Sequence, residues 1–287
     1  MSTFWRWLPP LYSSEYRSVV INGRIEHPFS LPTVRCEVCD QRSYTPGTLP
    51  LACPPCLRRN KFLRDYDDDL SMAAFQRLVS KLVSTLPARD RRGVPWRPGL
   101  KLQPAFVDLP SCPESDVLWP SPGSLLVSAR LRSVLRPWLG RTVRTCPITL
   151  RRVGRRRPQG PFREPRSGEP EDLIPSVGRT RSKALPRVSA YYEMILLDQV
   201  PDPPGIPFCP LCPLCGERVY RDTEGEHWRE VYEAEKQAWA RLDQEGLARL
   251  MGNRSLALVN GAILSSTEIR HALEQANVSN LRFAPFP

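Results

Sequence analysis

The segment Leu31-Pro-Thr-Val-Arg-Cys36-Glu-Val-Cys39 ends in two cysteines separated by two residues. Such a Cys-x-x-Cys turn, here called a knuckle, places two thiolates where both can reach one tetrahedral metal ion at about 2.3 Å. Two knuckles complete a shell of four sulfurs. The sequence therefore predicts a structural zinc site that includes Cys36 and Cys39.

Two other cysteine groups compete to complete this site. Cys53-Pro-Pro-Cys56 follows soon after the first knuckle and would close a local zinc ribbon with little loop entropy. Cys209-Pro-Leu-Cys212-Pro-Leu-Cys215-Gly216 lies far downstream and would clamp the two ends of the chain together. Gly216 suits a knuckle because glycine takes positive φ easily, and Asp40, in the same place after Cys39, tolerates that conformation. The choice between the two groups stays open, and Cys53 and Cys56 also have the spacing of a redox dithiol.

The composition predicts a globular protein of the cytoplasm. The 287 residues are 41% hydrophobic, enough for a sizeable core, and 32 prolines predict many irregular connections. We expect no signal peptide from the first residues, and no apolar run approaches the roughly 18 residues that span a bilayer. Because cytoplasmic thiols stay reduced, nine cysteines favour metal binding over a disulfide framework.

The spacing of apolar residues predicts a loop-rich α+β fold with antiparallel strands, a zinc-knuckle or zinc-ribbon element and about four helices. Helices are expected at about 67–86, 131–138, 224–251 and 265–276, the last opened by the capping-box spacing Ser265-Ser-Thr-Glu268. Runs of β propensity at 146–153 and 189–197 are expected to pair as an antiparallel ribbon. A strand at 255–259, the last helix and a strand at 281–286 form a predicted carboxyl-terminal strand-helix-strand unit.

Composition and charge divide the chain into parts. Residues 1–60 form the predicted zinc-knuckle strand region, and 61–153 is expected to continue into 188–287 as one compact unit with it. Residues 154–187 are rich in arginine and proline and poor in apolar side chains, so we expect a disordered insertion there. Residues 129–188 carry 16 basic and 4 acidic side chains, whereas 189–287 carry 9 basic and 14 acidic ones. The overall charge of +11 is therefore a local feature.

Nothing in the sequence predicts a catalytic site. The three histidines, His27, His227 and His271, form no persuasive constellation with a nucleophile or an acid. A zinc deaminase needs His-x-Glu ahead of Pro-Cys-x-x-Cys, and no His-x-Glu occurs. The motifs of phosphate-binding loops, dinucleotide-binding folds, metalloproteases and serine hydrolases are also absent. We therefore predict a binding protein that is not an enzyme.

Across nearly its whole length the chain resembles the myxobacterial double-CxxCG proteins, which are immunity proteins for lipoprotein toxins exchanged between neighbouring cells. The first knuckle with its Leu31-Pro lead-in is similar to the family's first motif, and Cys212-Pro-Leu-Cys215-Gly216 is similar to the second. Further similar segments are Pro98-Gly99 before Pro104, Leu118-Trp-Pro-Ser-Pro122 to Leu125-Leu-Val127, and the Thr267-Glu268 helix with the Leu281-Arg-Phe283 strand. Asp40 departs from the family's glycine, and Cys53, Cys56 and the 154–187 insertion are additions.

The resemblance implies a protein that neutralises a cognate toxin by stoichiometric binding, with one structural zinc shared by Cys36, Cys39, Cys212 and Cys215. Cys53, Cys56 and Cys209 remain candidate metal ligands, so the number of zinc sites stays open, as does the oligomeric state. Because nuclease toxins are basic, acidic side chains of the predicted 224–251 helix are candidate toxin contacts. These residues are Glu224, Glu226, Glu230, Glu233 and Glu235.

The arginine-rich segment supports a competing interpretation, a zinc-ribbon protein that binds nucleic acid through residues 151–187. The candidate phosphate contacts are Arg151, Arg152, Arg155, Arg156 and Arg157. Phe162 is the only aromatic residue of this segment, so base stacking there would be weak. A solvated linker without any ligand is the third interpretation of the same segment.

Overall fold

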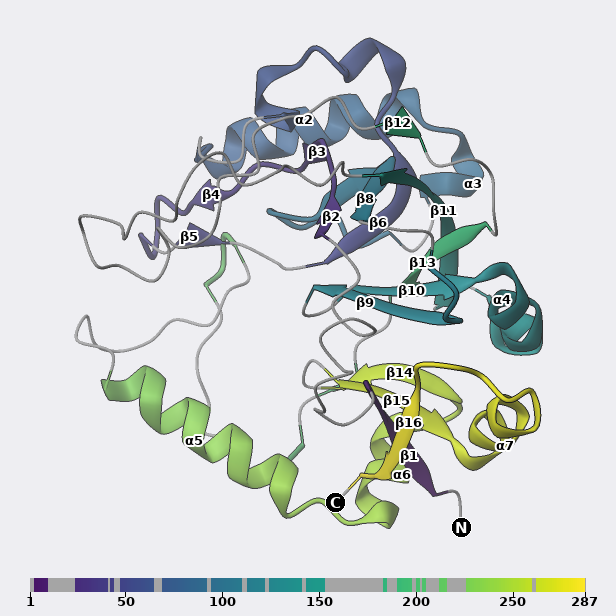
Figure 1. Cartoon of the computed structure of the whole chain (residues 1–287). Coiled ribbons are helices and arrows are strands. Elements are labelled where there is room, and N and C mark those ends of the chain that lie inside the picture. Colours follow the sequence, from purple (N-terminus) through teal and green to yellow (C-terminus); the bar gives the residue numbers. More distant parts are fainter. Residues whose placement is uncertain are drawn as a thin grey trace, which may run out of the picture.

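The computed structural model shows an α+β protein in which helices pack on β-sheets, in agreement with the predicted class (Figure 1). The structure describes residues 3–9, 24–40, 42–43, 47–64, 69–91, 94–109, 113–121, 124–140, 143–152, 183–184, 190–197, 200–201, 203–204, 212–215, 226–259 and 262–286. None of the helices in these ranges is both long enough and apolar enough to cross a bilayer.

A seven-stranded sheet forms the centre of the molecule (Figure 1). Its strands are β2 (Arg24–Glu26), β8 (Ala105–Leu109), β9 (Val117–Ser121), β10 (Ser124–Ser128), β11 (Val143–Arg152), β12 (Lys183–Ala184) and β13 (Tyr191–Leu196). They lie in the order β2-β8-β11-β13-β10-β9, and β12 pairs with the end of β11. All these pairs are antiparallel except β8 with β11, which run parallel. The sheet is therefore mixed, whereas only antiparallel pairing was predicted.

Strands β11 and β13 form the antiparallel ribbon predicted from residues 146–153 and 189–197. Val143 lies opposite Leu196, and Pro147 lies opposite Tyr192. The pairing is confirmed, although β11 begins earlier than predicted. Apart from β12, the insertion predicted at 154–187 lies outside the described residues.

A smaller sheet and the first long helix enclose a first apolar core. The elements are β3 (Phe29–Ser30), β6 (Thr48–Ala52), β7 (Lys101–Gln103), α2 (Met72–Thr85), the short α3 (Ala88–Arg91) and the 3-10 turns η1 (Pro55–Leu57) and η2 (Lys61–Leu63). The helix predicted from about residue 67 begins at Met72, because the Ser71 side chain accepts a hydrogen bond from the Ala74 backbone N–H at 3.2 Å. Phe75, Leu78 and Leu82 face the core, at the spacing of one helix stripe.

A buried carboxylate joins the smaller sheet to the central sheet. Glu193 of β13 accepts hydrogen bonds from the Thr48 hydroxyl at 2.9 Å and the Gln103 amide at 2.7 Å. His27, which links β2 to β3, places its Nε2 3.0 Å from Glu193 Oε2. Because the three partners come from three segments, this side chain forms a hydrogen-bonded link between the two sheets.

The carboxyl-terminal layer is a four-stranded antiparallel sheet with a helix packed on it. Its elements are β1 (Phe4–Leu8), β14 (Leu256–Val259), β15 (Ala262–Ser266), α7 (Thr267–Gln275) and β16 (Arg282–Pro285), with strand order β14-β15-β1-β16. The predicted unit differs in two respects. Strand β15 was not expected, and Ser266, instead of Ser265, caps α7 by accepting a hydrogen bond from the Ile269 backbone N–H. Ser265 lies in β15, where its hydroxyl accepts a hydrogen bond from Trp7 Nε1 at 2.8 Å.

The single helix predicted at 224–251 is two helices, α5 (Glu226–Ala240) and α6 (Gln244–Met251). Asp243 has an extended backbone, and its carboxylate accepts a hydrogen bond from the Gly246 backbone N–H at 2.7 Å. This N-cap starts a new helix, so the chain bends before it. Figure 1 shows α5 along one side of the molecule and α6 beside the carboxyl-terminal sheet.

Helix α4 (Ala129–Leu135), continued by the 3-10 turn η3 (Arg136–Trp138), connects the central sheet to the carboxyl-terminal layer. Leu131 and Leu135 of α4 share a buried core with Ile269 and Leu273 of α7. Arg130 donates a hydrogen bond to the Ala276 carbonyl at 2.7 Å, at the carboxyl end of α7. A cation is favourable there because helix carbonyls are unpaired at that end.

Candidate metal centre

Four cysteine sulfurs from distant parts of the chain meet at one point. Cys36 and Cys39 come from the first knuckle, and Cys212 and Cys215 come from the third cysteine group. Their Sγ atoms all lie within 4.8 Å of one another. Within the described ranges, no other three His, Cys, Asp or Glu side chains gather in this way. The cluster is therefore the candidate metal centre.

Two of the sulfur–sulfur distances fit a tetrahedral ion. Cys36 Sγ lies 3.6 Å from Cys212 Sγ, and Cys39 Sγ lies 3.7 Å from Cys215 Sγ. Thiolates that are about 2.3 Å from a central zinc stand about 3.8 Å apart along a tetrahedral edge. A disulfide instead joins its sulfurs at about 2.05 Å. The four cysteines could thus hold one metal ion, and an all-sulfur donor set suits a soft metal.

The first knuckle lies between β4 (Val34–Arg35) and β5 (Arg42–Ser43), which pair as a two-stranded hairpin. Asp40 takes a φ of 54°, and its backbone N–H donates a hydrogen bond to the Cys36 carbonyl at 2.9 Å. Arg35 donates two hydrogen bonds to the Asp40 carboxylate, at 2.8 and 3.0 Å, and these bonds lower the pKa of Asp40. Asp40 therefore takes the left-handed conformation that was expected at this position.

Backbone groups of the second knuckle favour the thiolate form of Cys212, which is the form that binds a metal. The backbone N–H groups of Cys215 and Leu214 donate hydrogen bonds to Cys212 Sγ, and they lower the pKa of the Cys212 thiol to about 6. The thiolate, which these bonds favour, is the form that binds metals. Cys215 also packs against the first core, so this segment lies on the amino-terminal part of the fold.

Asp69 fixes the hairpin to the chain that leads into α2. Its carboxylate accepts hydrogen bonds from the Thr33 hydroxyl and from Arg42 Nε, the latter at 2.8 Å, and the Thr33 bond is the main reason that the pKa of Asp69 is lowered. The Arg35 backbone N–H donates to the Leu70 carbonyl at 3.1 Å, and the Leu70 N–H donates to Thr33 at 3.0 Å. These bonds join both strands of the hairpin to the chain that leads into α2.

The alternative ligand pair does not belong to the cluster. Cys53 is buried in the first core, where burial raises the pKa of its thiol to about 11, and Cys56 is exposed. A protonated, buried thiol is a poor metal ligand. Cys209 lies outside the described residues. Of the two arrangements left open by the sequence, the structure brings together the one that clamps distant parts of the chain.

Three of the five acidic candidates have described side chains, all on α5. Glu230 and Glu233 are exposed, and Glu235 is partly buried. Glu233 lies 3.6 Å from Lys236, one helical turn further on. Glu224 lies outside the described residues, as does the side chain of Glu226. The solvent-facing position of Glu230 and Glu233 allows a partner to reach them.

Of the arginine candidates, only the side chain of Arg151 is described, and it is engaged within the protein. It donates hydrogen bonds to Asp108 at 2.7 and 3.1 Å and to Glu26, and its guanidinium lies 4.8 Å from the centre of the Phe106 ring. Two carboxylates thus balance its charge. The side chain of Arg152 and the whole of Arg155, Arg156 and Arg157 lie outside the described residues.

Sequence reasoning missed the apolar tips of the knuckles. Val38 is 62% exposed and Leu214 is 38% exposed, and with Tyr232 they are the exposed large apolar side chains of the described residues. Val38 and Leu214 each occupy a position between two metal-site cysteines, where the tight turn keeps the side chain out of the core. The signal was present in the sequence as an aliphatic residue inside each of these two Cys-x-x-Cys turns.

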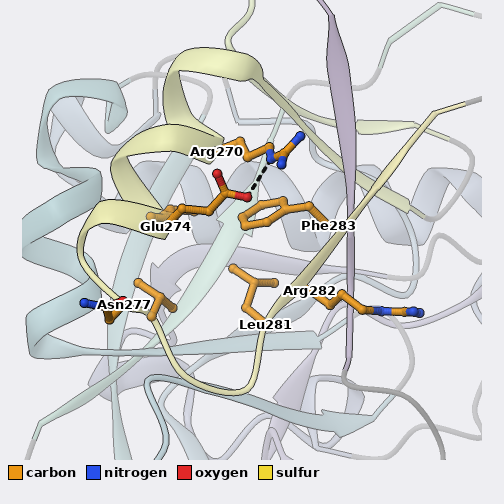
Figure 2. Close-up of a pocket in the computed structure, with 8 residues that line it drawn as sticks. Arg270, Glu274, Asn277, Leu281, Arg282 and Phe283 are labelled. Atoms are coloured by element: carbon orange, nitrogen blue, oxygen red, sulfur yellow. Dashed lines mark hydrogen bonds and ion pairs between the residues drawn. The ribbon is translucent and has the colours of Figure 1, made fainter.

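A separate pocket of about 370 Å3 lies between α7 and β16 (Figure 2). Leu273, Leu281 and Phe283 supply apolar lining. Arg270 at its rim donates a hydrogen bond to Glu274 at 2.7 Å and stacks on Trp5, so these two opposite charges balance each other. No sequence-predicted site residue lines this pocket.

No family model matches the chain, and no curated protein sequence matches it. The interpretation of the four-sulfur cluster therefore rests on its geometry and on the residues around it.

Proposed function

We propose that this protein is a cytoplasmic immunity protein that binds and neutralises a cognate toxin, with a structural zinc at Cys36, Cys39, Cys212 and Cys215. The observation that carries the proposal is the meeting of these four sulfurs. They are the ligands implied by the resemblance to double-CxxCG proteins, and Cys53 and Cys56 are not among them. In this role the protein binds its partner and catalyses no reaction.

The zinc would act as a clamp. It would join Cys36 and Cys39 to a segment far along the chain, and closing so long a loop costs chain entropy that a metal bond offsets. A structural site needs four protein ligands and no open position for a substrate, which matches four cysteines. The clamp would thus hold a loop-rich surface rigid enough to bind a partner.

We assign two sets of exposed side chains to toxin binding, one acidic and one apolar. Glu230 and Glu233 give the exposed face of α5 negative charge, which suits a basic toxin. Val38 and Leu214 offer exposed aliphatic groups of the kind that anchor interfaces. Two charge-neutral surface positions, Gln76 and Gln275, provide matched control sites on α2 and α7.

Co-expression with the product of the gene next to this protein's own gene tests the proposal. That product alone should stop growth, and the full-length chain should restore it. Purified, the two proteins should form a complex of one to one stoichiometry with a Kd in the nanomolar range, typical of specific protein pairs.

Substitutions then show how much the acidic and the apolar side chains each contribute to the affinity. Glu230→Gln combined with Glu233→Gln should weaken the complex roughly ten-fold, and Val38→Ser combined with Leu214→Ser by at least as much. Gln76→Ala and Gln275→Ala should leave the Kd unchanged. A neighbouring product that is harmless, or a toxin that kills equally in the presence of the chain, contradicts the immunity proposal.

Nucleic-acid binding through residues 151–187 is the competing function, favoured by the concentration of basic side chains in 129–188. It predicts affinity for a DNA duplex that falls steeply with salt and disappears when 154–187 is deleted. Immunity should survive the same deletion. The ion pairs of Arg151 with Asp108 and Glu26 support the immunity proposal, because they leave this arginine less available to a phosphate.

A further inference from the structure

Two of the four cysteines of the candidate metal centre are buried, and the other two are partly exposed. Cys36 and Cys212 are buried, whereas Cys39 and Cys215 are partly open to solvent. A dissolved oxidant therefore reaches one edge of the cluster first. That edge consists of one sulfur from each knuckle.

The sulfurs of that edge already lie close together. Cys39 Sγ and Cys215 Sγ are 3.7 Å apart, so a disulfide at about 2.05 Å requires them to approach by less than 2 Å. We propose that the Cys39–Cys215 edge is an oxidation site, at which a peroxide forms a disulfide between the two knuckles and releases the metal. The inference rests on the zinc site of the proposed function and not on the toxin.

The reaction proceeds in two balanced steps. The Cys39 thiolate attacks one oxygen of hydrogen peroxide, which breaks the O–O bond, gives a sulfenic acid and releases hydroxide. The Cys215 thiolate then attacks the Cys39 sulfur, forms the S–S bond and releases a second hydroxide. The peroxide takes up the two electrons that the sulfurs lose. Zinc leaves because only two of its four thiolates remain.

The consequence is that oxidation replaces one clamp with another. A disulfide within a knuckle would free the two ends of the chain, whereas a Cys39–Cys215 disulfide keeps them joined. The protein would consequently lose its metal under peroxide and retain the long-range connection that the metal provided.

The other described thiols are poorer targets, with one exception. Burial raises the pKa of Cys53 and of Cys146 to about 11, so both stay protonated and shielded. Cys56 is exposed and would react independently of the metal. Cys56→Ser removes this background without touching the four-sulfur cluster.

The test uses the zinc-loaded, full-length Cys56→Ser protein and hydrogen peroxide. Zinc is measured before treatment, and its release is followed with a metallochromic indicator while disulfides are mapped by mass spectrometry. Cleavage after Glu37 separates Cys36 from Cys39, and cleavage after Leu214 separates Cys212 from Cys215. We expect release of one zinc per chain in step with a peptide that links Cys39 to Cys215.

Thermal unfolding provides an independent readout. The oxidised protein should unfold at nearly the same temperature with and without a chelator, whereas the reduced protein should lose stability when its zinc is chelated. Disulfides inside a knuckle, or a Cys36–Cys212 disulfide that forms first, would overturn the inference and leave the zinc proposal intact. Absence of zinc before peroxide would instead overturn the metal site itself.

Discussion

The knuckle region and the carboxyl-terminal layer are both built from segments far apart in sequence, but they are held together differently. In the carboxyl-terminal layer, β1 pairs with β15 and β16, and Trp7, Ile269 and Leu273 share a core with α4. At the knuckles, the long-range link consists of four sulfurs at one corner of the first core. The carboxyl-terminal layer is therefore held by strand pairing and apolar packing. The knuckle region is held by the four sulfurs of a single site.

This difference predicts how each region fails. Apolar packing is spread over many side chains, so one substitution removes part of the stabilising free energy. A metal clamp is lost as a whole when one ligand is removed. The two regions should therefore respond differently to the removal of one group.

Removal of the metal should produce the largest effect. Structural zinc contributes on the order of 10 kcal/mol in small metal-dependent domains, so chelation or Cys212→Ser should lower the free energy of unfolding by several kcal/mol. Hydrogen exchange should show the loss at residues 31–43, while β14 to β16 keep their protection. Uniform loss of protection over the whole chain would contradict a local clamp.

Truncation of Leu273, a core side chain of α7, should produce the next largest loss of stability. Leu273 is fully buried between α7 and α4, so Leu273→Ala should reduce the free energy of unfolding by about 2–5 kcal/mol, as measured by urea denaturation. Zinc content should not change. The exposed neighbour Gln275→Ala should cost less than about 0.5 kcal/mol. Loss of zinc from the Leu273→Ala protein would show that the regions are not independent.

Asp116 makes the stability of the carboxyl-terminal layer depend on pH. Burial disfavours its charge, but hydrogen bonds from Arg130, from the Ser279 backbone and side chain and from Ser128 outweigh burial and lower its pKa to about 2. The ordinary value is 3.8, so ionised Asp116 contributes about 2 kcal/mol above pH 4. This contribution should disappear as the pH falls from about 4 to about 2.

Asp116→Asn should therefore be less stable than the unmodified protein by about 2 kcal/mol at pH 7. The difference should shrink toward pH 2, because the unmodified carboxyl also becomes neutral there. Unfolding in urea over this pH range provides the measurement. An equal difference at pH 7 and pH 2 would contradict the assignment.

Substitutions at Asp40 should have the smallest effect. Asp40→Gly favours the φ of 54° but loses an exposed pair with Arg35, and solvent screens such pairs, so the two changes nearly cancel. Asp40→Val should cost about 1–2 kcal/mol, because a branched side chain strains the left-handed region. Thermal unfolding of the zinc-loaded variants compares the two. Equal stability of the glycine and valine variants would contradict a conformational role.

Local patterns predicted much of the fold. The apolar stripe of Phe75, Leu78 and Leu82 indicated α2, and runs of β propensity indicated β11 and β13, because helices and strands leave their period in neighbouring residues. The division of α5 from α6 was missed, although Asp243 three residues before Gly246 was an available N-cap signal. The parallel β8–β11 pair could not be predicted, since strand direction depends on the path of the whole chain.

The metal site, like the fold, could be predicted only in part. Two Cys-x-x-Cys turns around residues 36 and 212 could be recognised, but spacing alone did not choose between the second and third cysteine groups. What separates the two groups is the local environment of each thiol. Cys53 packs inside the first core with a protonated thiol, while the backbone N–H groups around Cys212 favour its thiolate, and neither environment is visible before the chain folds.

Metal content shows whether the two distant knuckles share one ion. Purified protein analysed by inductively coupled plasma mass spectrometry should contain one zinc per chain, and Cys53→Ser with Cys56→Ser should contain the same amount. Cys212→Ser should contain none at matched protein concentration after dialysis. Metal-free protein, or zinc that disappears with Cys53 and Cys56 and persists without Cys212, would contradict a clamp formed by the two distant knuckles.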